Sequence, residues 1–301
     1  MGNIEQFFCE ELKRWQTAAD NYKRLQEIIT ASVDCGEYQI RLQFNPARIV
    51  STGAKIDATT IKERKCFLCE ANRVPEQKYL PWRSEKGTHE YQICINPFPI
   101  FKRHFTVADA QHTPQLIAGR VSDLLSLAQS FPMYTAFYNG PKSGASAPDH
   151  AHFQLIPQGE MPIEQDCKNP HLVVATEHPA VAHFKSNYMR SATHIKVTSK
   201  AEAVELLEQE LSKYQVKEGD AEVRMNLIAW YENKEYNLIF MPRTEHRPKQ
   251  FFLEEPEKIM FSPGAVDMGG LIIAPRGTDF EKYKSAQLLK ELYAQVSPTT
   301  K

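Results

Sequence analysis

Two histidines stand one residue apart in the stretch SGASAPDHAHFQLIP, residues 143–157. Successive side chains of a β-strand point to opposite faces, so His150, His152 and Gln154 are predicted to share one face. A neutral imidazole is a nucleophile near pH 7 and can attack phosphorus without a base to deprotonate it. An amide can donate to a phosphate oxygen but cannot deliver a proton. The pattern therefore indicates transfer of a phosphorus group through a covalent phosphohistidine.

A segment rich in small residues leads into this strand. It contains Gly140, Ser143, Gly144 and Ser146, and small side chains let backbone N–H groups approach a phosphate closely. No Gly-Lys-Ser/Thr follows at the spacing of a Walker loop, so that class of nucleotide site is excluded. A bare H-x-H also occurs on surface strands and in satisfied cores. The small-residue segment and the in-phase glutamine favour a functional site here.

Cys66 and Cys69 form a C-x-x-C pair. The chain has 6 cysteines among 301 residues, too few for a disulfide scaffold, so the pair indicates metal or redox chemistry. Two thiolates are half of a tetrahedral zinc site, which imidazoles usually complete, and this donor set favours zinc over iron. A redox pair or a merely buried pair stays open. The histidines nearest in pattern are His104, His112 and His150.

The spacing of apolar residues predicts the elements that carry these groups. Residues 1–33 have helical spacing, which predicts one amphipathic helix or a pair, packed on the fold or in a dimer contact. Further helices are predicted at 114–130, 201–214 and 279–295. Strands are predicted at 37–50, 91–100, 105–112, 133–140, 171–176, 193–199, twice within 222–243, and at 269–276. Meandering strands with a few helices indicate an α+β fold and not a regular βαβ array.

Composition excludes several classes of partner. The formal net charge is −1, which gives no bulk electrostatic reason for binding nucleic acid or a membrane surface. No run of about 18 apolar residues is present, so no membrane-spanning helix is predicted. The N-terminus carries early acidic residues and no apolar signal core. We therefore expect a cytoplasmic protein.

These stretches resemble the histidine-triad (HIT-like) superfamily, in its H-x-H-x-Q branch. CFLCEANRV resembles the zinc knuckle of galactose-1-phosphate uridylyltransferases, and INPFPIFKRHFTVADAQH resembles the superfamily's strand pair. YNGPKSGASAPDHAHFQLIP resembles the catalytic segment of diadenosine tetraphosphate phosphorylases and GDP-hexose phosphorylases, and HAHFQ is closest to the latter. SPGAVDMGGLIIAPRGTDFEKY resembles the end of that enzyme group more weakly. The strong similarity covers roughly residues 60–160.

The resemblance implies two fused HIT-like halves, each with an antiparallel sheet and flanking helices. Residues 1–165 would be the catalytic half with the zinc knuckle, and residues 166–301 a half that lacks the histidine motif. His246 in the second half is expected to be an ordinary loop histidine.

The resemblance also implies roles for individual residues. His152 would be the nucleophile that takes up a nucleoside monophosphate, and Gln154 would bind phosphate oxygens. A structural zinc would be held by Cys66, Cys69, His112 and His150. His112 is preferred to His104 because it follows the strand where the family's ligand does. Asn96 and Asn139 would contact the nucleotide, and its phosphates would lie against Lys142, Gly144 and Ser146.

The function expected from the resemblance is ping-pong nucleotidyl transfer from a nucleoside-diphosphate hexose, with a GDP-hexose favoured, to inorganic phosphate. A dinucleoside polyphosphate phosphorylase and a hexose-1-phosphate uridylyltransferase are the alternative enzymes. Asp149, inserted before His150, and Phe153, in place of a small residue, argue against the uridylyltransferase. A non-catalytic nucleotide-binding module is the alternative of another class. The partners would be a nucleotide or nucleotide sugar and phosphate, bound by a monomer or homodimer.

Overall fold

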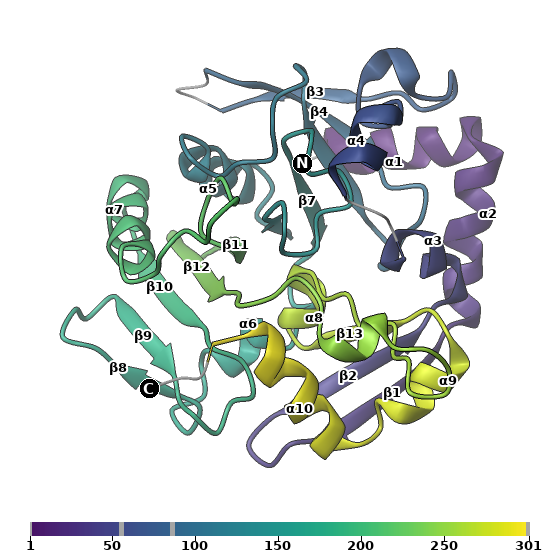
Figure 1. The fold of residues 1–301 in the computed structure, drawn as a ribbon. Coiled ribbons are helices and arrows are strands. Elements are labelled where there is room, and N and C mark those ends of the chain that lie inside the picture. The colour runs from purple at the N-terminus through teal and green to yellow at the C-terminus, as the bar shows by residue number, and fades with distance from the viewer. Residues whose placement is uncertain (1, 54–56, 85–87, 299–301) are drawn as a thin grey trace.

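The computed structural model describes residues 2–53, 57–84 and 88–298. A ten-stranded antiparallel sheet runs through the middle of the molecule (Figure 1), in the order β3-β4-β5-β7-β6-β11-β12-β10-β9-β8. Its strands are β3 (Leu80–Arg83), β4 (Glu90–Ile95), β5 (Phe105–Asp109), β6 (Tyr134–Asn139), β7 (His152–Pro157), β8 (Val173–Ala175), β9 (Val181–Phe184), β10 (Thr193–Val197), β11 (Met225–Glu232) and β12 (Glu235–Pro242). The α+β class predicted from the sequence is confirmed.

The large sheet draws five strands from residues 80–157 and five from residues 173–242. The two sets meet where β6 pairs with β11, in a register that places Asn139 opposite Asn226. Asn139, the last residue of β6, therefore lies beside a residue of the second set of strands. The division into halves at residue 165 stays a prediction.

A second, three-stranded sheet joins the two ends of the chain. It contains β1 (Ile29–Asp34), β2 (Gln39–Phe44) and β13 (Leu271–Ala274), and β13 runs parallel to β2. The helix or pair of helices predicted over residues 1–33 is therefore wrong for residues 29–33, which lie in β1. The β-branched residues of that stretch pair with β2, and this tertiary contact overrides the helical spacing.

Helices flank both sheets. They are α1 (Gly2–Arg14), α2 (Gln16–Arg24), α3 (Ile49–Thr52), α4 (Ala58–Glu63), α5 (Val121–Ser130), α6 (Ile163–Asp166), α7 (Lys200–Leu211), α8 (Ala265–Met268), α9 (Gly277–Lys282) and α10 (Ala286–Val296). Short 3-10 turns lie at Leu25–Glu27, Pro46–Arg48, Glu70–Asn72 and Lys249–Phe252. Within the described residues, none of the helices has both the length and the apolar character needed to cross a membrane.

Two of the predicted helices differ from the observed ones. The helix predicted at 114–130 begins only at Val121, because the Gln115 amide donates to the carbonyls of Asn139 and His152 and holds its segment against the strand ends. The helix predicted at 279–295 is two helices, since Ser285 caps the start of α10 by accepting from the N–H of Leu288.

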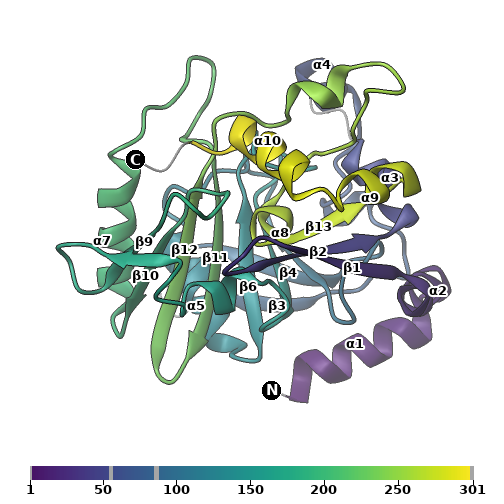
Figure 2. The ribbon, with the colours of Figure 1, turned by 90° about the horizontal axis from the view of Figure 1, so that it is seen from below.

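Each face of the large sheet buries its own core. α1, α2, α5 and α7 supply apolar residues to one core, which also takes Phe153 and Leu155 of β7. The small sheet and α8 to α10 supply the other core, which takes Ile156. Figure 2 shows β1, β2 and β13 running across the large sheet with α9 and α10 beside them. Because side chains alternate along β7, His152 and Gln154 lie on the side of this second core.

Candidate active site and metal site

A cavity of about 790 Å³ opens on the side of the large sheet that carries His152 and Gln154. The walls come from both halves of the chain. Residues before 165 that line it include Asn96, Asn139, Gly144, Ser146, His152 and Gln154. The C-terminal half contributes His246, Arg247 and several residues between 261 and 273. The cavity has the size of a nucleotide or larger ligand site.

His152 is held in one orientation and one tautomer. Its Nδ1 lies 2.8 Å from the carbonyl oxygen of His150, and a carbonyl only accepts, so Nδ1 carries the proton. The lone pair is therefore on Nε2. The backbone N–H of His152 donates to Gln115 Oε1 over 2.7 Å, which fixes the start of β7. Burial lowers the pKa of His152 to about 4, so the ring is a neutral nucleophile at physiological pH.

Gln154 is oriented by His104. The N–H of Ile100 donates to His104 Nδ1 over 3.3 Å, so the proton of this ring is on Nε2, which donates to Gln154 Oε1 over 2.8 Å. Burial, followed by the charge of Arg48, lowers the pKa of His104 to about 3 and keeps it neutral. The Gln154 oxygen is thus occupied, and its NH₂ group remains as a donor to a ligand. The structure places His104 beside Gln154 and away from the two cysteines.

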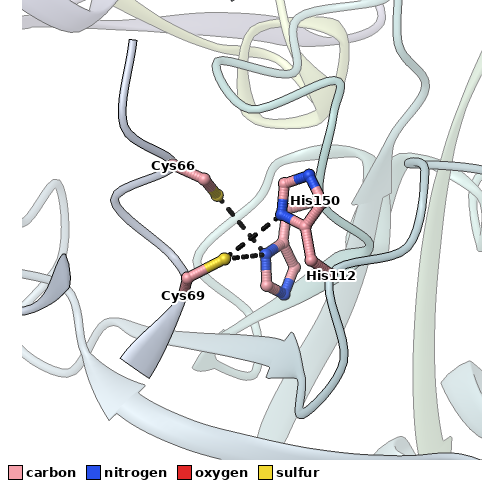
Figure 3. Close-up of side chains that lie close together, drawn as sticks. All are labelled: Cys66, Cys69, His112 and His150. Atoms are coloured by element: carbon pink, nitrogen blue, oxygen red, sulfur yellow. Dashed lines mark hydrogen bonds between the residues drawn. The ribbon is translucent and has the colours of Figure 1, made fainter. Parts of the chain in front are cut away.

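Cys66, Cys69, His112 and His150 lie together, with their potential ligand atoms all within 4.8 Å of one another. Figure 3 shows both sulfurs facing the two imidazoles, with Cys69 Sγ 3.2 Å from His112 Nδ1 and Cys66 Sγ 3.4 Å from His150 Nδ1. His150 Nε2 donates to the carbonyl of Asp109 over 2.8 Å, so its Nδ1 is free to be a ligand. Two thiolates and two imidazoles at this spacing fit a tetrahedral structural metal.

The alternation predicted for the H-x-H motif holds only in part. His150 precedes β7, and its N–H donates to the carbonyl of Ala147 in a turn. The pleat of the strand therefore does not govern its side chain, and the prediction that it shares a face with His152 and Gln154 is wrong. Each histidine of the motif faces a different site.

The inserted residue Asp149 connects the motif to the C-x-x-C segment. Its carboxylate forms an ion pair with Arg64, whose guanidinium lies 4.9 Å from the centroid of the Phe67 ring. Asn72 donates to the carbonyl of Cys66 over 2.9 Å and closes the turn around the cysteines. The segment that holds the thiols is thus attached directly to the loop that holds His150.

Asn96 and Asn139 both line the cavity, and their oxygens are engaged by the protein. Asn96 Oδ1 accepts from the N–H of Phe98 over 2.9 Å. Asn139 Oδ1 accepts from Asn226 Nδ2 and from the N–H of Ala265, at 2.8 and 2.7 Å. Asn139 therefore joins the two halves of the chain, in addition to any contact with a ligand.

Only some residues of the small-residue loop (residues 140–147) line the cavity. Ser146 and Gly144 line the cavity, whereas Lys142 is not among the described lining residues. The Lys142 ammonium forms an ion pair with Asp220 and donates to the carbonyl of Gly219 over 3.2 Å. The structure thus does not bring Lys142 to the other predicted site residues.

Several residues that line the cavity belong to no sequence motif, so the sequence alone did not identify them. The described lining includes Arg48, Arg64, Arg73 and Arg247, with Asp267 as its one acidic residue. This balance favours an anionic ligand. The arginines are scattered widely along the sequence, so only the fold brings them together. Exposed rings also line the cavity, from Phe67 at 48% and Phe98 at 50% exposure.

Sequence comparison identifies the family. The family model described as "Domain of unknown function (DUF4922)" matches residues 7–157, half of the chain. This chain belongs to the DUF4922 family. The matched DUF4922 segment contains the Cys66, Cys69, His112 and His150 cluster, His152 and Gln154, but none of the C-terminal wall of the cavity. No curated protein matches the chain.

The solved structures similar to this DUF4922 protein include yeast Ap4A phosphorylase Apa2. That structure superposes with a TM-score of 0.63 at 16% identity, over 95% of this chain and 97% of that chain. The same enzyme in complex with Ap4A gives 0.61 at 14% identity, over 97% and 99%. Its complex with AMP gives 0.54 at 17% identity, over 97% and 98%. The DUF4922 chain therefore has the mixed α+β fold of this enzyme over nearly its whole length.

Proposed function

We propose that this protein is a nucleotide phosphorylase that works through a covalent nucleotidyl-His152 intermediate, with a dinucleoside polyphosphate as donor. The observation that carries the proposal is the tautomer of His152. Its Nδ1 proton is held by the carbonyl of His150, and its Nε2 lone pair is left in a cavity lined by four arginines. A neutral, oriented imidazole beside cationic groups suits attack on a phosphate ester.

The reaction would proceed in two displacements. Nε2 of His152 attacks the α-phosphorus, the bond to the bridging oxygen breaks, and its electron pair leaves with the departing nucleotide. The proton stays on Nδ1, where the His150 carbonyl stabilises the positive charge that develops on the ring. Phosphate then attacks the phosphorus and expels Nε2. The Gln154 NH₂ group would donate to a non-bridging oxygen in both steps.

The cavity supports a dinucleoside polyphosphate better than the GDP-hexose favoured from the sequence. That preference depends on Phe153, which is 2% exposed and packs against Tyr91 and Tyr138 on the opposite face of the sheet. Phe153 is thus not among the residues that line the cavity, so it does not select the sugar by direct contact. Four arginines suit a chain of phosphates, and the exposed rings of Phe67 and Phe98 suit stacking on bases. The similar yeast enzyme has been solved in complex with Ap4A and with AMP.

The metal cluster would have a structural role. We propose that Cys66, Cys69, His112 and His150 hold zinc, which fixes the turn that contains His150 and hence the carbonyl that orients His152. The zinc supplies no chemistry to the transfer itself. The two-half organisation and the contacts of Asn96, Asn139 and Ser146 with nucleotide belong to the same proposal.

Intact-mass measurement without an acceptor tests the proposal. The protein is mixed with diadenosine tetraphosphate, diguanosine tetraphosphate, GDP-hexose and UDP-hexose. We expect a mass increase of one nucleoside monophosphate with a dinucleoside polyphosphate, its absence in His152→Ala, and its retention in His178→Ala, where an exposed histidine is changed. Binding of nucleotide without any adduct would instead support a binding module.

A further inference from the structure

His246 lies at the junction between the two halves of the chain, and no step of the reaction above uses it. It lines the same cavity as His152, from the segment that follows β12. The N–H of Gly144 donates to its Nδ1 over 3.4 Å. Its Nε2 is buried and has no hydrogen-bond partner among the residues that the structure describes. A buried polar atom that lacks a partner and borders a cavity suggests a ligand group that the cavity receives.

The contact with Gly144 fixes the tautomer of His246. A backbone N–H can only donate, so Nδ1 must present its lone pair, and the ring proton is on Nε2. The charged ring, with protons on both nitrogens, is incompatible with this contact. Burial, followed by the neighbouring charges of Arg247 and Arg243, lowers the pKa of His246 to about 3, against a smaller opposing effect of the Lys142 backbone. His246 is thus a neutral donor, whereas His152 is a neutral acceptor.

The contact also changes the role expected for the small-residue loop. The sequence predicts that Gly144 binds phosphate directly, but its N–H is occupied by His246. The backbones of Gly144 and Gly264 are closely packed, since a Cβ on Gly144 would lie 2.4 Å from the Cα of Gly264. This packing holds Gly144 in place. The imidazole therefore stands between the loop and the cavity, and its Nε2–H takes the place of the amide as donor.

We propose that His246 Nε2–H donates a hydrogen bond to the departing phosphate when His152 is nucleotidylated. This inference rests on the proposed function. As the bond between the α-phosphorus and the bridging oxygen breaks, the electron pair collects on the leaving phosphate, and a fixed donor there stabilises the charge. His246 keeps its proton throughout and acts as a donor of a hydrogen bond, not as an acid. His152 and Gln154 would hold the α-phosphate from β7, so a donor on the separate segment after β12 would serve the leaving side.

Two substitutions distinguish the loss of the Nε2–H donor from the loss of the acceptor that holds Gly144. In His246→Gln, the side-chain nitrogen can reach the place of Nε2, while the acceptor for Gly144 is lost. In His246→Asn, the side-chain oxygen can replace Nδ1 as the acceptor for Gly144, while the donor is lost. The rate of adduct formation with diadenosine tetraphosphate is measured in single turnovers. We expect His246→Asn to be about 100-fold slower than wild type, and His246→Gln to lie within about tenfold of wild type.

A nucleotidyl substrate whose leaving group is not a phosphate gives the decisive control. Adenosine 5′-phosphorimidazolide forms the same adduct on His152 but expels imidazole, so His246→Asn should react with it at the wild-type rate. The inference is overturned if the order of the two variants is reversed, if neither variant is slowed, or if the phosphorimidazolide reaction is slowed equally. Failure of the proposed function is distinct, because wild type would then form no adduct with either donor.

Discussion

At the scale of single residues, the site depends on hydrogen bonds that choose between tautomers. His104, His152 and His246 each make a backbone contact that decides which nitrogen carries the proton. Two of these rings present N–H groups, and His152 presents a lone pair. The chemistry of the cavity is therefore set by main-chain groups of the surrounding turns.

Changing His104 tests this arrangement. His104→Phe removes the donor to Gln154 Oε1, and the amide can then rotate and present its oxygen to the ligand. We expect adduct formation to slow by up to about 100-fold, because small misplacements of a catalytic contact are that costly. Metal content should not change, since His104 lies outside the metal cluster. Bound metal is measured alongside the single-turnover rate, and unchanged rates would contradict the role of His104.

The sequence predicted the site unevenly at this scale. His152, Gln154 and the cysteines stand in short motifs whose spacing is chemically informative, and the structure places each next to suitable partners. His246 stands in no motif, and its place follows from a contact across 102 residues. Lys142 had a plausible position in the loop, but Asp220 engages its charge. The positions of His246 and Lys142 thus depend on contacts between segments that are distant in the sequence, which residue spacing does not reveal.

At the scale of elements, the small-residue loop is held by close backbone contact. Gly144 has a φ of +96° and lies against Gly264, so Gly144→Ala adds both a left-handed strain and a clash. We expect the free energy of unfolding to fall by roughly 1–3 kcal/mol, with loss of adduct formation. Gly219 is the matched control, since its φ is +75° and no atom lies within 4 Å of the position that a Cβ would take. Equal effects of Gly144→Ala and Gly219→Ala in urea unfolding would exclude the backbone contact.

The cluster of Cys66, Cys69, His112 and His150 joins an irregular segment to the sheet. The segment of Cys66 and Cys69 has few regular elements of its own, so removal of the metal with a chelator should release it. We expect a lower melting temperature and slower adduct formation, both restored by added zinc. Cys66→Ser should reproduce the loss, and Cys9→Ser, at an exposed free thiol, should not. A chelator-insensitive melting temperature would contradict a structural metal.

The elements were predictable where local and tertiary preferences agree. The two strands predicted within 222–243 are confirmed as β11 and β12, and their hairpin turns at Asn233 and Lys234, which both have positive φ. Residues 29–34 failed the same test, because their strand exists only through pairing with β2. The parallel contact of β13 with β2 has no local signal at all.

At the scale of the whole molecule, the folded protein excludes protons from several histidines. Burial lowers the pKa of His194 to about 4, with smaller effects from neighbouring lysines, and the ring stacks on Trp230 far along the sheet from the cavity. The unfolded chain binds a proton near pH 6.5, so stability is full above that pH and falls as the pH decreases toward 4. Each such ring contributes about 1.4 kcal/mol per pH unit in this window.

Replacing one of these rings should change that slope. In His194→Phe, the dependence of the unfolding free energy on pH between 6.5 and 5 should decrease by about 1.4 kcal/mol per unit. His178→Phe, at an exposed position, should leave the slope unchanged. Urea titrations across this pH range give the comparison. An unaltered slope in His194→Phe would show that this histidine is not held neutral.

The parallel pairing of β13 with β2 has a consequence for the order in which the protein is made. A growing chain exposes His152, the thiols of Cys66 and Cys69, and the β1–β2 hairpin well before residues 246–274 leave the ribosome. Until then the cavity lacks one wall, and the hairpin has one edge without its final neighbour. Synthesis of residues 246–274 thus closes the small sheet and the cavity together, so a nascent chain acquires its enclosed site only after these residues have been made.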